Sequence, residues 1–234
     1  AAETLRRLRQ RGIPVIPCTS KTAEEVERFR AEAGLRDPYI VENGGAIHGE
    51  TLQGEPFHDS LGPTWAELKP RLQQLAADLG EPLRALDELS PAEGDRLLGL
   101  SGEGLLQAQR RCCSVPFVAP SPDLRPRLQQ LAADRGLTIV QGNRMAHLLG
   151  AGVSKGRALT VLQQRLGAEG VRVLGLGDSP NDLPLLEAAD VAVVVPGAEG
   201  PHPALRDGLE SGRFELAPFP HARGWAEAVQ RITL

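Results

Sequence analysis

Two aspartates separated by a tight turn are the residues of this chain best suited to chemistry. Asp178 and Asp182 flank Ser179-Pro180-Asn181, in a loop that follows the apolar run 171–176 and precedes a helix predicted over 183–189. Open α/β sheets bind ligands at the carboxyl ends of their strands, where this loop is expected. Two carboxylates this close repel unless a cation lies between them, and Mg²⁺ accepts one or two carboxylates together with waters and phosphate oxygens. The loop indicates a Mg²⁺ site, although Asp, Ser, Asn and Pro are also ordinary turn and helix-cap residues.

A lysine at a predicted helix start is the second candidate. The 26 basic residues include only three lysines, Lys21, Lys69 and Lys155. Lys155 begins a helix predicted to run to about Leu166, and the positive end of the helix dipole disfavours a cation there. A lysine in that place needs an anion for compensation. A phosphate or carboxylates are therefore expected near Lys155.

A strand-to-helix loop offers further polar groups. The sequence predicts a buried strand over 13–18 and a helix over 23–33, with Thr19, Ser20 and Lys21 in the loop between them. Their hydroxyls and ammonium could hold a phosphate at the start of the helix. The alternative is a plain Ser/Thr helix cap.

Paired glycines follow the next predicted strand, 38–41. Asn43 and Gly44 belong to a turn in which glycine permits conformations that other residues adopt only at a cost. Such a turn brings the backbone close to whatever lies at the strand ends. A simple hairpin turn is the competing explanation.

The middle of the chain predicts an inserted domain. The string Pro-Arg-Leu-Gln-Gln-Leu-Ala-Ala-Asp occurs at 70–78 and again at 126–134, within helices predicted over 64–79 and 124–135. Two copies indicate a smaller α+β unit with two similar halves rather than a solenoid. We therefore predict a Rossmann-like α/β core, with a parallel sheet and helices on both faces, over 1–47 and 152–234. An α+β cap is predicted over 48–151.

Basic residues of the predicted cap are candidates for meeting an anionic substrate. Arg110 and Arg111 lie within the predicted cap, directly before Cys112. Arg144 and His147 lie on a hairpin whose strands are predicted over 137–141 and 144–149, joined through Gly142-Asn143. Each of these side chains could equally be a solvated surface residue. Their approach to a phosphate or carboxylate would use charge-assisted hydrogen bonds.

Composition excludes several classes of function. The 234 residues carry a net charge of -4 with mixed signs, so no polybasic surface for nucleic acid is expected. No apolar run approaches the roughly 20 residues that span a bilayer, and no signal peptide opens the chain. The three cysteines, Cys18, Cys112 and Cys113, do not suit a disulfide framework or a zinc site. A cytoplasmic protein, a monomer or homodimer with no membrane or nucleic-acid partner, is expected.

These pieces together resemble the haloacid dehalogenase-like phosphatases that carry a cap inserted into a Rossmann-like core. The resemblance covers nearly the whole chain and rests on four motifs, in order: Cys18 to Thr22, Val41 to Ala46, Ser154 to Ala158 and Gly177 to Leu183. Within the superfamily the chain is similar to the mannosyl-3-phosphoglycerate phosphatases. That similarity rests on Thr-Ser-Lys-Thr and on the run Arg111 to Phe117.

The resemblance implies Mg²⁺-dependent phosphoryl transfer through an aspartyl-phosphate, here from mannosyl-3-phosphoglycerate to water in mannosylglycerate biosynthesis. It implies that Thr19 and Lys155 hold the phosphate, that Asp178 and Asp182 anchor the metal, and that Asn181 steadies the loop. Another phosphorylated sugar remains an alternative substrate. The physics agrees, because a loose phosphoryl transition state is stabilised mainly by positioned charges and hydrogen-bond donors.

The chain departs from the family pattern in two places. The Asp-x-Asp-Gly-Thr motif that supplies the family's nucleophile is absent from the sequence. We expect it in a segment that precedes Ala1. The alternative is a phosphate-binding protein on a catalytically dead scaffold. In the cap, Cys112, Cys113 and Val115 stand where the family carries acidic or aromatic groups, which leaves the sugar open.

Overall fold

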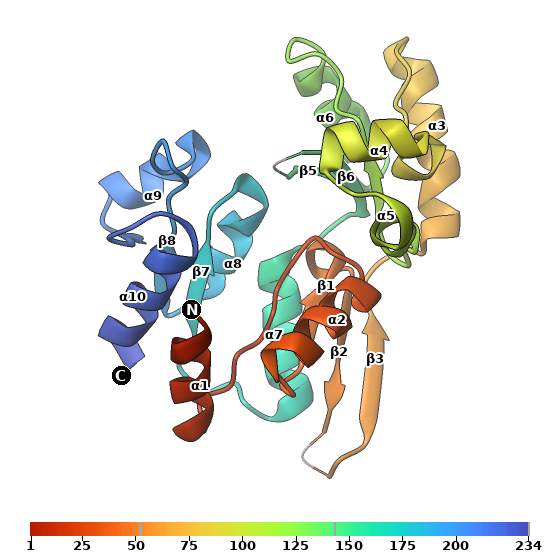
Figure 1. Cartoon of the computed structure of the whole chain (residues 1–234). Helices are drawn as coiled ribbons and strands as arrows, with labels where there is room; N and C mark the ends of the chain where they lie inside the picture. The colour runs from red at the N-terminus through yellow and green to blue at the C-terminus, as the bar shows by residue number, and fades with distance from the viewer. Residues whose placement is uncertain (52, 143, 234) are drawn as a thin grey trace.

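The structure is a computed structural model and describes residues 1–51, 53–142 and 144–233. Figure 1 shows two bodies, with helices α3 to α6 and their sheet set above the rest of the chain. The helices α1 (Ala2–Gln10) and α10 (His221–Thr233) contact each other, so the two ends of the chain share one side of the molecule. No helix in the described part of the chain is both long and apolar enough to cross a membrane.

A parallel sheet carries the central loop. Its strands are β7 (Leu174–Gly177), β8 (Val191–Val194) and β9 (Glu215–Leu216), hydrogen-bonded in that order and all parallel. Successive residues of β8 point to opposite faces: Ala192 and Val194 pack with the α8 and α9 side, and Val193 and Val195 pack with α10. Both faces of the sheet are therefore covered by helices, as the α/β prediction requires.

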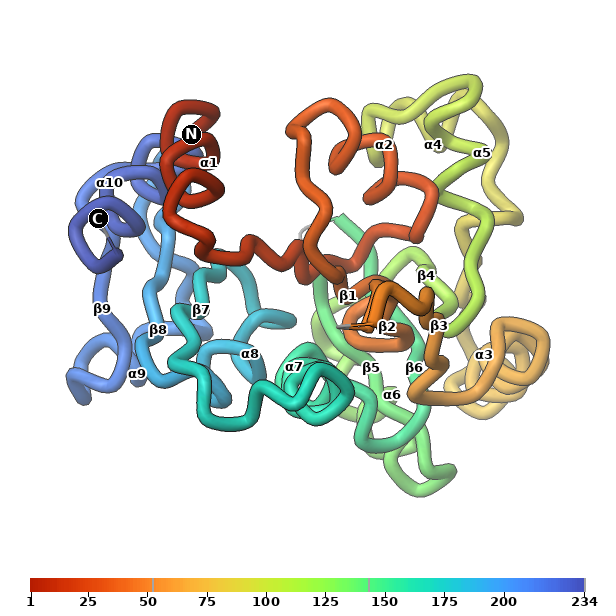
Figure 2. The backbone as a smooth tube through the Cα atoms, turned by 90° about the horizontal axis from the view of Figure 1, so that it is seen from below, coloured from red at the N-terminus to blue at the C-terminus, as the bar shows by residue number. Residues whose placement is uncertain are grey.

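The helices of this half follow the predicted bounds closely. They are α2 (Ala23–Ala33), α7 (Lys155–Leu166), α8 (Leu183–Ala188) and α9 (Arg206–Glu210). Helix α7 packs against α8 on one side and against β1 (Tyr39–Val41) on the other, and Figure 2 shows it between the two halves of the core. The start of α7, where Lys155 lies, is thereby held between α8 and the turn that follows β1.

A second core sheet is antiparallel. It consists of β1, β2 (Ala46–Glu50) and β3 (Pro56–Ser60), with Val41 opposite Ala46 across a short 3-10 turn at Glu42–Gly44. The hairpin explanation of this turn is therefore confirmed. The predicted boundary between residues 47 and 48 falls inside β2, because the hairpin continues the sheet of β1. We propose that the cap begins after Ser60.

The strand predicted over 13–18 is wrong as a buried, regular strand. The segment forms one parallel bridge, between Cys18 and Ile40, and its residues are half-buried or exposed. Pro14 and Pro17 lack the N–H groups that a β-ladder needs. Their carbonyl groups can still accept, and the Pro17 carbonyl oxygen accepts a hydrogen bond from the Ile40 N–H at 2.8 Å. Likewise β7 begins at Leu174 rather than Val171, which is 59% exposed.

The cap is an antiparallel three-stranded sheet covered by two helices. Its strands run in the order β4 (Val115–Phe117), β6 (Ala146–Gly150), β5 (Leu137–Gln141), and the covering helices are α3 (Trp65–Leu79) and α6 (Arg125–Ala133). The repeated string lies on α3 and α6, whose leucines share one apolar cluster with the sheet. The short helices α4 (Pro91–Leu98) and α5 (Gly102–Gln109) complete the cap. The predicted turn at Gly142-Asn143 includes Asn143, which lies outside the described residues.

Candidate active site

A cavity of about 630 Å³ lies between the core and the cap. Its wall brings together most of the side chains that the sequence indicated. From the core come Thr19, Ser20, Lys21, Lys155, Asp178, Asn181 and Asp182, and from the cap come Arg111, Arg144 and His147. Residues that are far apart in the sequence thus meet around one space, which is the condition that a shared phosphate site requires.

Lys155 and Asp182 form a buried ion pair at the floor of the cavity. The Lys155 Nζ lies 2.5 Å from Asp182 Oδ1, and the two side chains are only 5% and 8% exposed. Burial raises the pKa of Asp182, but the Lys155 ammonium and the amides of Asp178 and Ser179 outweigh it, so the pKa lies below its usual range. The anion that Lys155 needs at a helix start is therefore supplied by Asp182.

The second oxygen of Asp182 organises the loop itself. Asp182 Oδ2 accepts hydrogen bonds from the backbone amides of Asp178 at 2.9 Å and Ser179 at 3.1 Å, and lies 3.2 Å from the Ser179 hydroxyl. A Cβ at Gly177 would lie 2.4 Å from the Asp182 Cβ, so glycine permits this approach. Since both oxygens of Asp182 accept from protein groups, we propose that Asp182 positions Lys155 and the loop and that Asp178 is the metal ligand.

Asp178 has the opposite character. It is exposed, lines the cavity, and has the Ser179 hydroxyl 2.8 Å from its Oδ1. A carboxylate that faces open space, within a site where substrate phosphate could add oxygens, is what Mg²⁺ accepts. In the described part of the chain, no group of three or more His, Cys, Asp and Glu could hold a metal alone. The donor set fits a magnesium ion held by Asp178, waters and phosphate, but not a cage built from protein groups.

Two buried amides support the same loop. Asn181 Nδ2 donates to Asn43 Oδ1 at 2.8 Å, and Asn43 has a left-handed backbone with φ of 59°. Asn181 Oδ1 and Asn43 Nδ2 have no hydrogen-bond partner among the described residues. Asn181 lines the cavity, so its free oxygen is positioned for a ligand, a water or a metal-bound group.

Asn43 and Gly44 were predicted to bind substrate, but neither lines the cavity. Asn43 lies behind Asn181. A Cβ on Gly44 would lie 2.2 Å from the Ser154 carbonyl oxygen, so the turn packs directly on the start of α7. We propose that both residues support the positions of Asn181 and Lys155 instead of contacting substrate.

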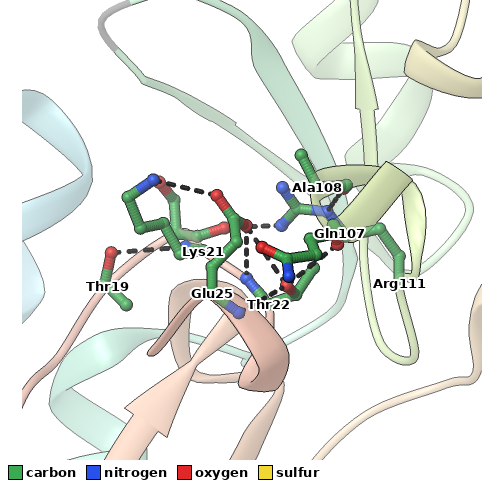
Figure 3. A network of polar contacts seen from close by, with 8 residues as sticks. Thr19, Lys21, Thr22, Glu25, Gln107, Ala108 and Arg111 are labelled. Carbon is green, nitrogen blue, oxygen red and sulfur yellow. Dashed lines mark hydrogen bonds and ion pairs between the residues drawn. The ribbon is translucent and has the colours of Figure 1, made fainter. Parts of the chain in front are cut away.

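The loop before α2 ends in the residue that caps that helix. Thr22 is the N-cap: its hydroxyl accepts from the Glu25 amide, while the Glu25 carboxylate accepts from the Thr22 amide at 2.9 Å. The Ser/Thr-cap explanation of the loop is therefore confirmed at Thr22, while Thr19 and Ser20 do not cap the helix. The Lys21 ammonium pairs with Glu25 Oε1 at 2.8 Å, as Figure 3 shows, so its charge is already compensated. The Thr19 Oγ1 accepts a hydrogen bond from the Lys21 amide at 3.3 Å (Figure 3), which leaves its own O–H to donate.

Arg111 ties the cap to this loop. Its Nη1 donates to the Ser20 carbonyl oxygen at 2.5 Å and its Nε to the Ala108 carbonyl oxygen at 2.8 Å (Figure 3). Burial lowers the pKa of Arg111, and the nearby Glu42 and Glu25 carboxylates oppose that shift. The guanidinium still lines the cavity. Arg110, by contrast, points to Glu24 on the surface.

The other two cap candidates lie on and beside β6. Arg144 is exposed at the cavity wall, and His147 is buried with 6% exposure. Burial lowers the pKa of His147 to about 3, and the positive charges of Arg111 and Lys155 add to that effect. The imidazole is therefore neutral. Its Nδ1 is buried and has no hydrogen-bond partner among the described residues.

Several residues of the site were missed by the sequence reasoning. Ser179 binds both aspartates of the loop, and Glu42 is 2% exposed and accepts hydrogen bonds from the cap. Glu42 could have been noticed as a charged residue between an apolar strand and a glycine turn. His221 and Trp225 of α10 also line the cavity, but no local pattern distinguishes them.

The comparisons with known proteins agree with this geometry. A family model described as haloacid dehalogenase-like hydrolase matches residues 118–200. A protein of Persephonella marina named glucosyl-3-phosphoglycerate/mannosyl-3-phosphoglycerate phosphatase is 28% identical over 245 residues, which is 99% of this chain and 89% of that protein.

Solved structures show the same fold. A haloacid dehalogenase-like hydrolase from Bacteroides thetaiotaomicron matches with a TM-score of 0.68 at 18% identity, over 99% of this chain and 91% of that one. The sucrose-phosphatase of Synechocystis, solved with sucrose and phosphate, matches with a TM-score of 0.67 at 21% identity, also over 99% and 91%. With the four motifs gathered around one cavity, the chain is similar over residues 118–200 to the haloacid dehalogenase-like hydrolases and has the fold of the solved members of that group.

Proposed function

We propose that this protein is a Mg²⁺-dependent phosphomonoesterase that hydrolyses a glycosyl phosphoglycerate, converting mannosyl-3-phosphoglycerate to mannosylglycerate and phosphate. The observation that carries the proposal is the cavity itself. It places the buried ammonium of Lys155, the exposed carboxylate of Asp178 and the Thr19 hydroxyl in one wall with cap residues such as Arg144 and His147 opposite. The name of the similar Persephonella protein supports the substrate class.

The core residues account for binding of the phosphoryl group. Lys155, held by Asp182, keeps a positive charge at the cavity floor without needing to reorganise during the reaction. The Thr19 hydroxyl and the amide of Asn181 supply hydrogen bonds beside it. Asp178 would hold the Mg²⁺, which when bound neutralises charge that develops on the phosphoryl oxygens. These groups position and stabilise the phosphoryl group.

The resemblance supplies the covalent step. A carboxylate oxygen of an Asp-x-Asp motif would bond to phosphorus while the ester bond to the glycerate oxygen breaks, and that oxygen would take a proton as it leaves. Water would then attack the aspartyl-phosphate and release phosphate. The sequence contains no such motif, so the proposed activity requires a segment that supplies it.

The cap residues account for the rest of the substrate. Arg111 and Arg144 bring positive charge to the cavity, which suits the glycerate carboxylate, and the neutral imidazole of His147 suits a sugar hydroxyl. Closure of the cap over the cavity would exclude water before transfer. We place the reaction in the cytoplasm, because Cys18, Cys112 and Cys113 are free thiols, and we propose a monomer or homodimer as the active form.

The substrate is tested by measuring phosphate release by the full-length protein from a panel of glycosyl phosphoglycerates and other sugar phosphates. Mannosyl-3-phosphoglycerate or its glucosyl counterpart is expected to give the highest kcat/KM. A preference for a different sugar phosphate would retain the phosphatase and overturn the substrate. Phosphate binding without turnover would support the dead-scaffold alternative.

The metal role is tested by Asp178→Ala in the same protein. Because Asp178 is the exposed carboxylate of the cavity, its removal is expected to abolish Mg²⁺-dependent phosphate release and to weaken Mg²⁺ binding measured by calorimetry. Asp59→Ala changes a carboxylate that does not line the cavity and serves as the matched control. Unchanged turnover in Asp178→Ala would remove the metal role.

A further inference from the structure

Glu42 is a buried carboxylate that connects the core to the cap. It directly follows β1 and is 2% exposed. Its Oε1 accepts a hydrogen bond from the Cys112 amide at 2.8 Å, and its Oε2 accepts from the Cys113 amide at 3.0 Å and from the Ser114 hydroxyl at 2.7 Å. A carboxylate bound by several donors holds them more strongly than a neutral acceptor would. One core side chain therefore accepts hydrogen bonds from three successive cap residues.

The segment 112–114, which Glu42 holds, is also where the cap packs against the core. Cys113 belongs to an apolar cluster with Val26, Val41 and Ala46, all of them core residues. The Cys112 carbonyl oxygen accepts from the Trp65 amide at 2.6 Å, which anchors the start of α3 at the same place. The cap thus rests on the core where Glu42 holds it.

The segment 112–114 leads directly into β4, which pairs with the strand that carries His147. Ser114 is followed by β4, and Pro116 of β4 is opposite His147 of β6 in the sheet register. His147 lines the cavity with a free Nδ1. A shift at Cys112–Ser114 would therefore move the imidazole relative to Lys155 and the phosphate site.

The same turn reaches the catalytic loop on the other side. Glu42 and Asn43 both have left-handed backbones, with φ of 50° and 59°. Asn43 accepts a hydrogen bond from Asn181 of the central loop. Two successive non-glycine residues in this conformation are unusual and persist only where the surrounding contacts impose them. The strained pair points one side chain at the cap and the next at the phosphate site.

We propose that Glu42 is a positioning residue that sets the cap's substrate-facing strand relative to the phosphate site, and so controls recognition of the substrate beyond its phosphate. The inference rests on the proposed phosphatase function. It assigns Glu42 no contact with substrate, since Glu42 does not line the cavity. Its effect therefore passes through β4 and His147.

The test compares two substrates in the full-length Glu42→Gln variant. For mannosyl-3-phosphoglycerate, kcat/KM is expected to fall at least about tenfold, mainly through KM, because the loss of charge-assisted hydrogen bonds releases the cap. For p-nitrophenyl phosphate, which offers the cap no sugar or glycerate, the change is expected to stay within about threefold. Equal losses on both substrates, or no loss on either, would overturn the proposal.

A matched substitution separates position from charge. Glu24→Gln removes a core carboxylate that also pairs with the cap, through Arg110, but at an exposed site where ion pairs contribute little. It is expected to leave kcat/KM for both substrates unchanged. Ser114→Ala removes one of the three donors to Glu42. It is expected to lower kcat/KM for the sugar substrate by a smaller factor than Glu42→Gln does. If Glu42→Gln does not fold, Ser114→Ala decides the question alone: a loss confined to the sugar substrate supports the proposal, and no such loss overturns it.

Hydrogen exchange supplies a readout that does not depend on activity. The Cys112 and Cys113 amides are expected to exchange faster in Glu42→Gln than in the unaltered protein, while β7 and β8 keep their protection. If the unaltered protein hydrolysed neither substrate, the proposed function would fail. Unchanged amide exchange in Glu42→Gln would separately show that Glu42 does not hold the cap, and would overturn the inference.

Discussion

The core and cap walls of the cavity differ in how their polar groups are satisfied. In the core, the Asp182 carboxylate is engaged at both oxygens, by Lys155 on one side and by the Asp178 and Ser179 groups on the other. In the cap, Arg144 is exposed and the Nδ1 of His147 has no partner among the described residues. The pair of Lys155 and Asp182 in the core wall is therefore organised before any ligand arrives, whereas these two cap side chains form no ion pair among the described residues.

This contrast matches the two tasks of a phosphatase. Phosphoryl transfer needs charges that do not reorganise, because reorganisation costs free energy in the transition state. Recognition of the remaining substrate needs groups that are satisfied only when the correct partner fills the site. Substitutions of the buried pair Lys155 and Asp182 should therefore reduce turnover and stability together, and those in the cap wall should change substrate affinity.

The largest effect is expected from Lys155→Ala. It removes the buried ammonium of the core wall and leaves Asp182 without its partner, so kcat/KM for phosphate release should fall by about 10²-fold to 10³-fold. Lys69→Ala is the matched control, since Lys69 pairs with Asp87 within the cap and does not line the cavity. A loss below about tenfold would make Lys155 a structural residue only.

The second prediction compares the two aspartates of one loop. Asp182→Asn breaks a buried ion pair and should lower the free energy of unfolding by about 3 kcal/mol, measured by urea denaturation. Asp178→Asn changes an exposed carboxylate and should lower it by about 0.5 kcal/mol or less, although turnover should fall. Similar losses of stability in the two variants would contradict the division of roles between them.

The third prediction concerns pH and the cap wall. The pKa of His147 is lowered from 6.5 to about 3 in the folded protein by burial and by the charges of Arg111 and Lys155. Between these values the unfolded chain binds a proton that the folded protein does not, so the stability from His147 is complete above pH 6.5 and falls as pH is lowered toward 3. Unfolding measured across this window should show a shallower slope in His147→Asn. An unchanged slope would show that His147 is not held neutral.

The smallest effect is expected from Arg144→Ala. Because this guanidinium is exposed and the catalytic charges lie in the core wall, KM for the sugar substrate should rise about tenfold while kcat changes less than about twofold. Arg127→Ala, at an exposed cap position away from the cavity, serves as the control. A fall in kcat with constant KM would place Arg144 in the chemistry and weaken the contrast between the walls.

Local signals predicted the helices that position the site. The bounds of α2 and α7 agree with the sequence because Thr22 and Ser154 cap their N-termini and glycines end them. The strand over 13–18 was mispredicted because hydrophobicity outweighed the two prolines that interrupt its hydrogen bonding. The predicted domain boundary fell inside β2 because nothing in the local sequence says which sheet a strand joins.

The roles of individual site residues were harder to predict. Asp178 and Asp182 have the same side chain and lie in one short loop, yet one faces the cavity and the other is buried against Lys155. Asn43 and Gly44 were expected at the substrate and instead lie behind Asn181 and against Ser154. Spacing along the chain limits which residues can meet, but not which oxygen is left free.

By itself, the sequence determined that acidic, basic and hydroxyl groups follow successive strands, and that a second body interrupts the α/β pattern, because these features depend on local periodicity and turn chemistry. Only the tertiary structure decided that Asp182 neutralises Lys155, that Asp178 remains available for a metal, and that Glu42 holds the cap. Those assignments depend on contacts between segments many residues apart, such as Glu42 with Cys113, and on which groups lose water when these segments pack together.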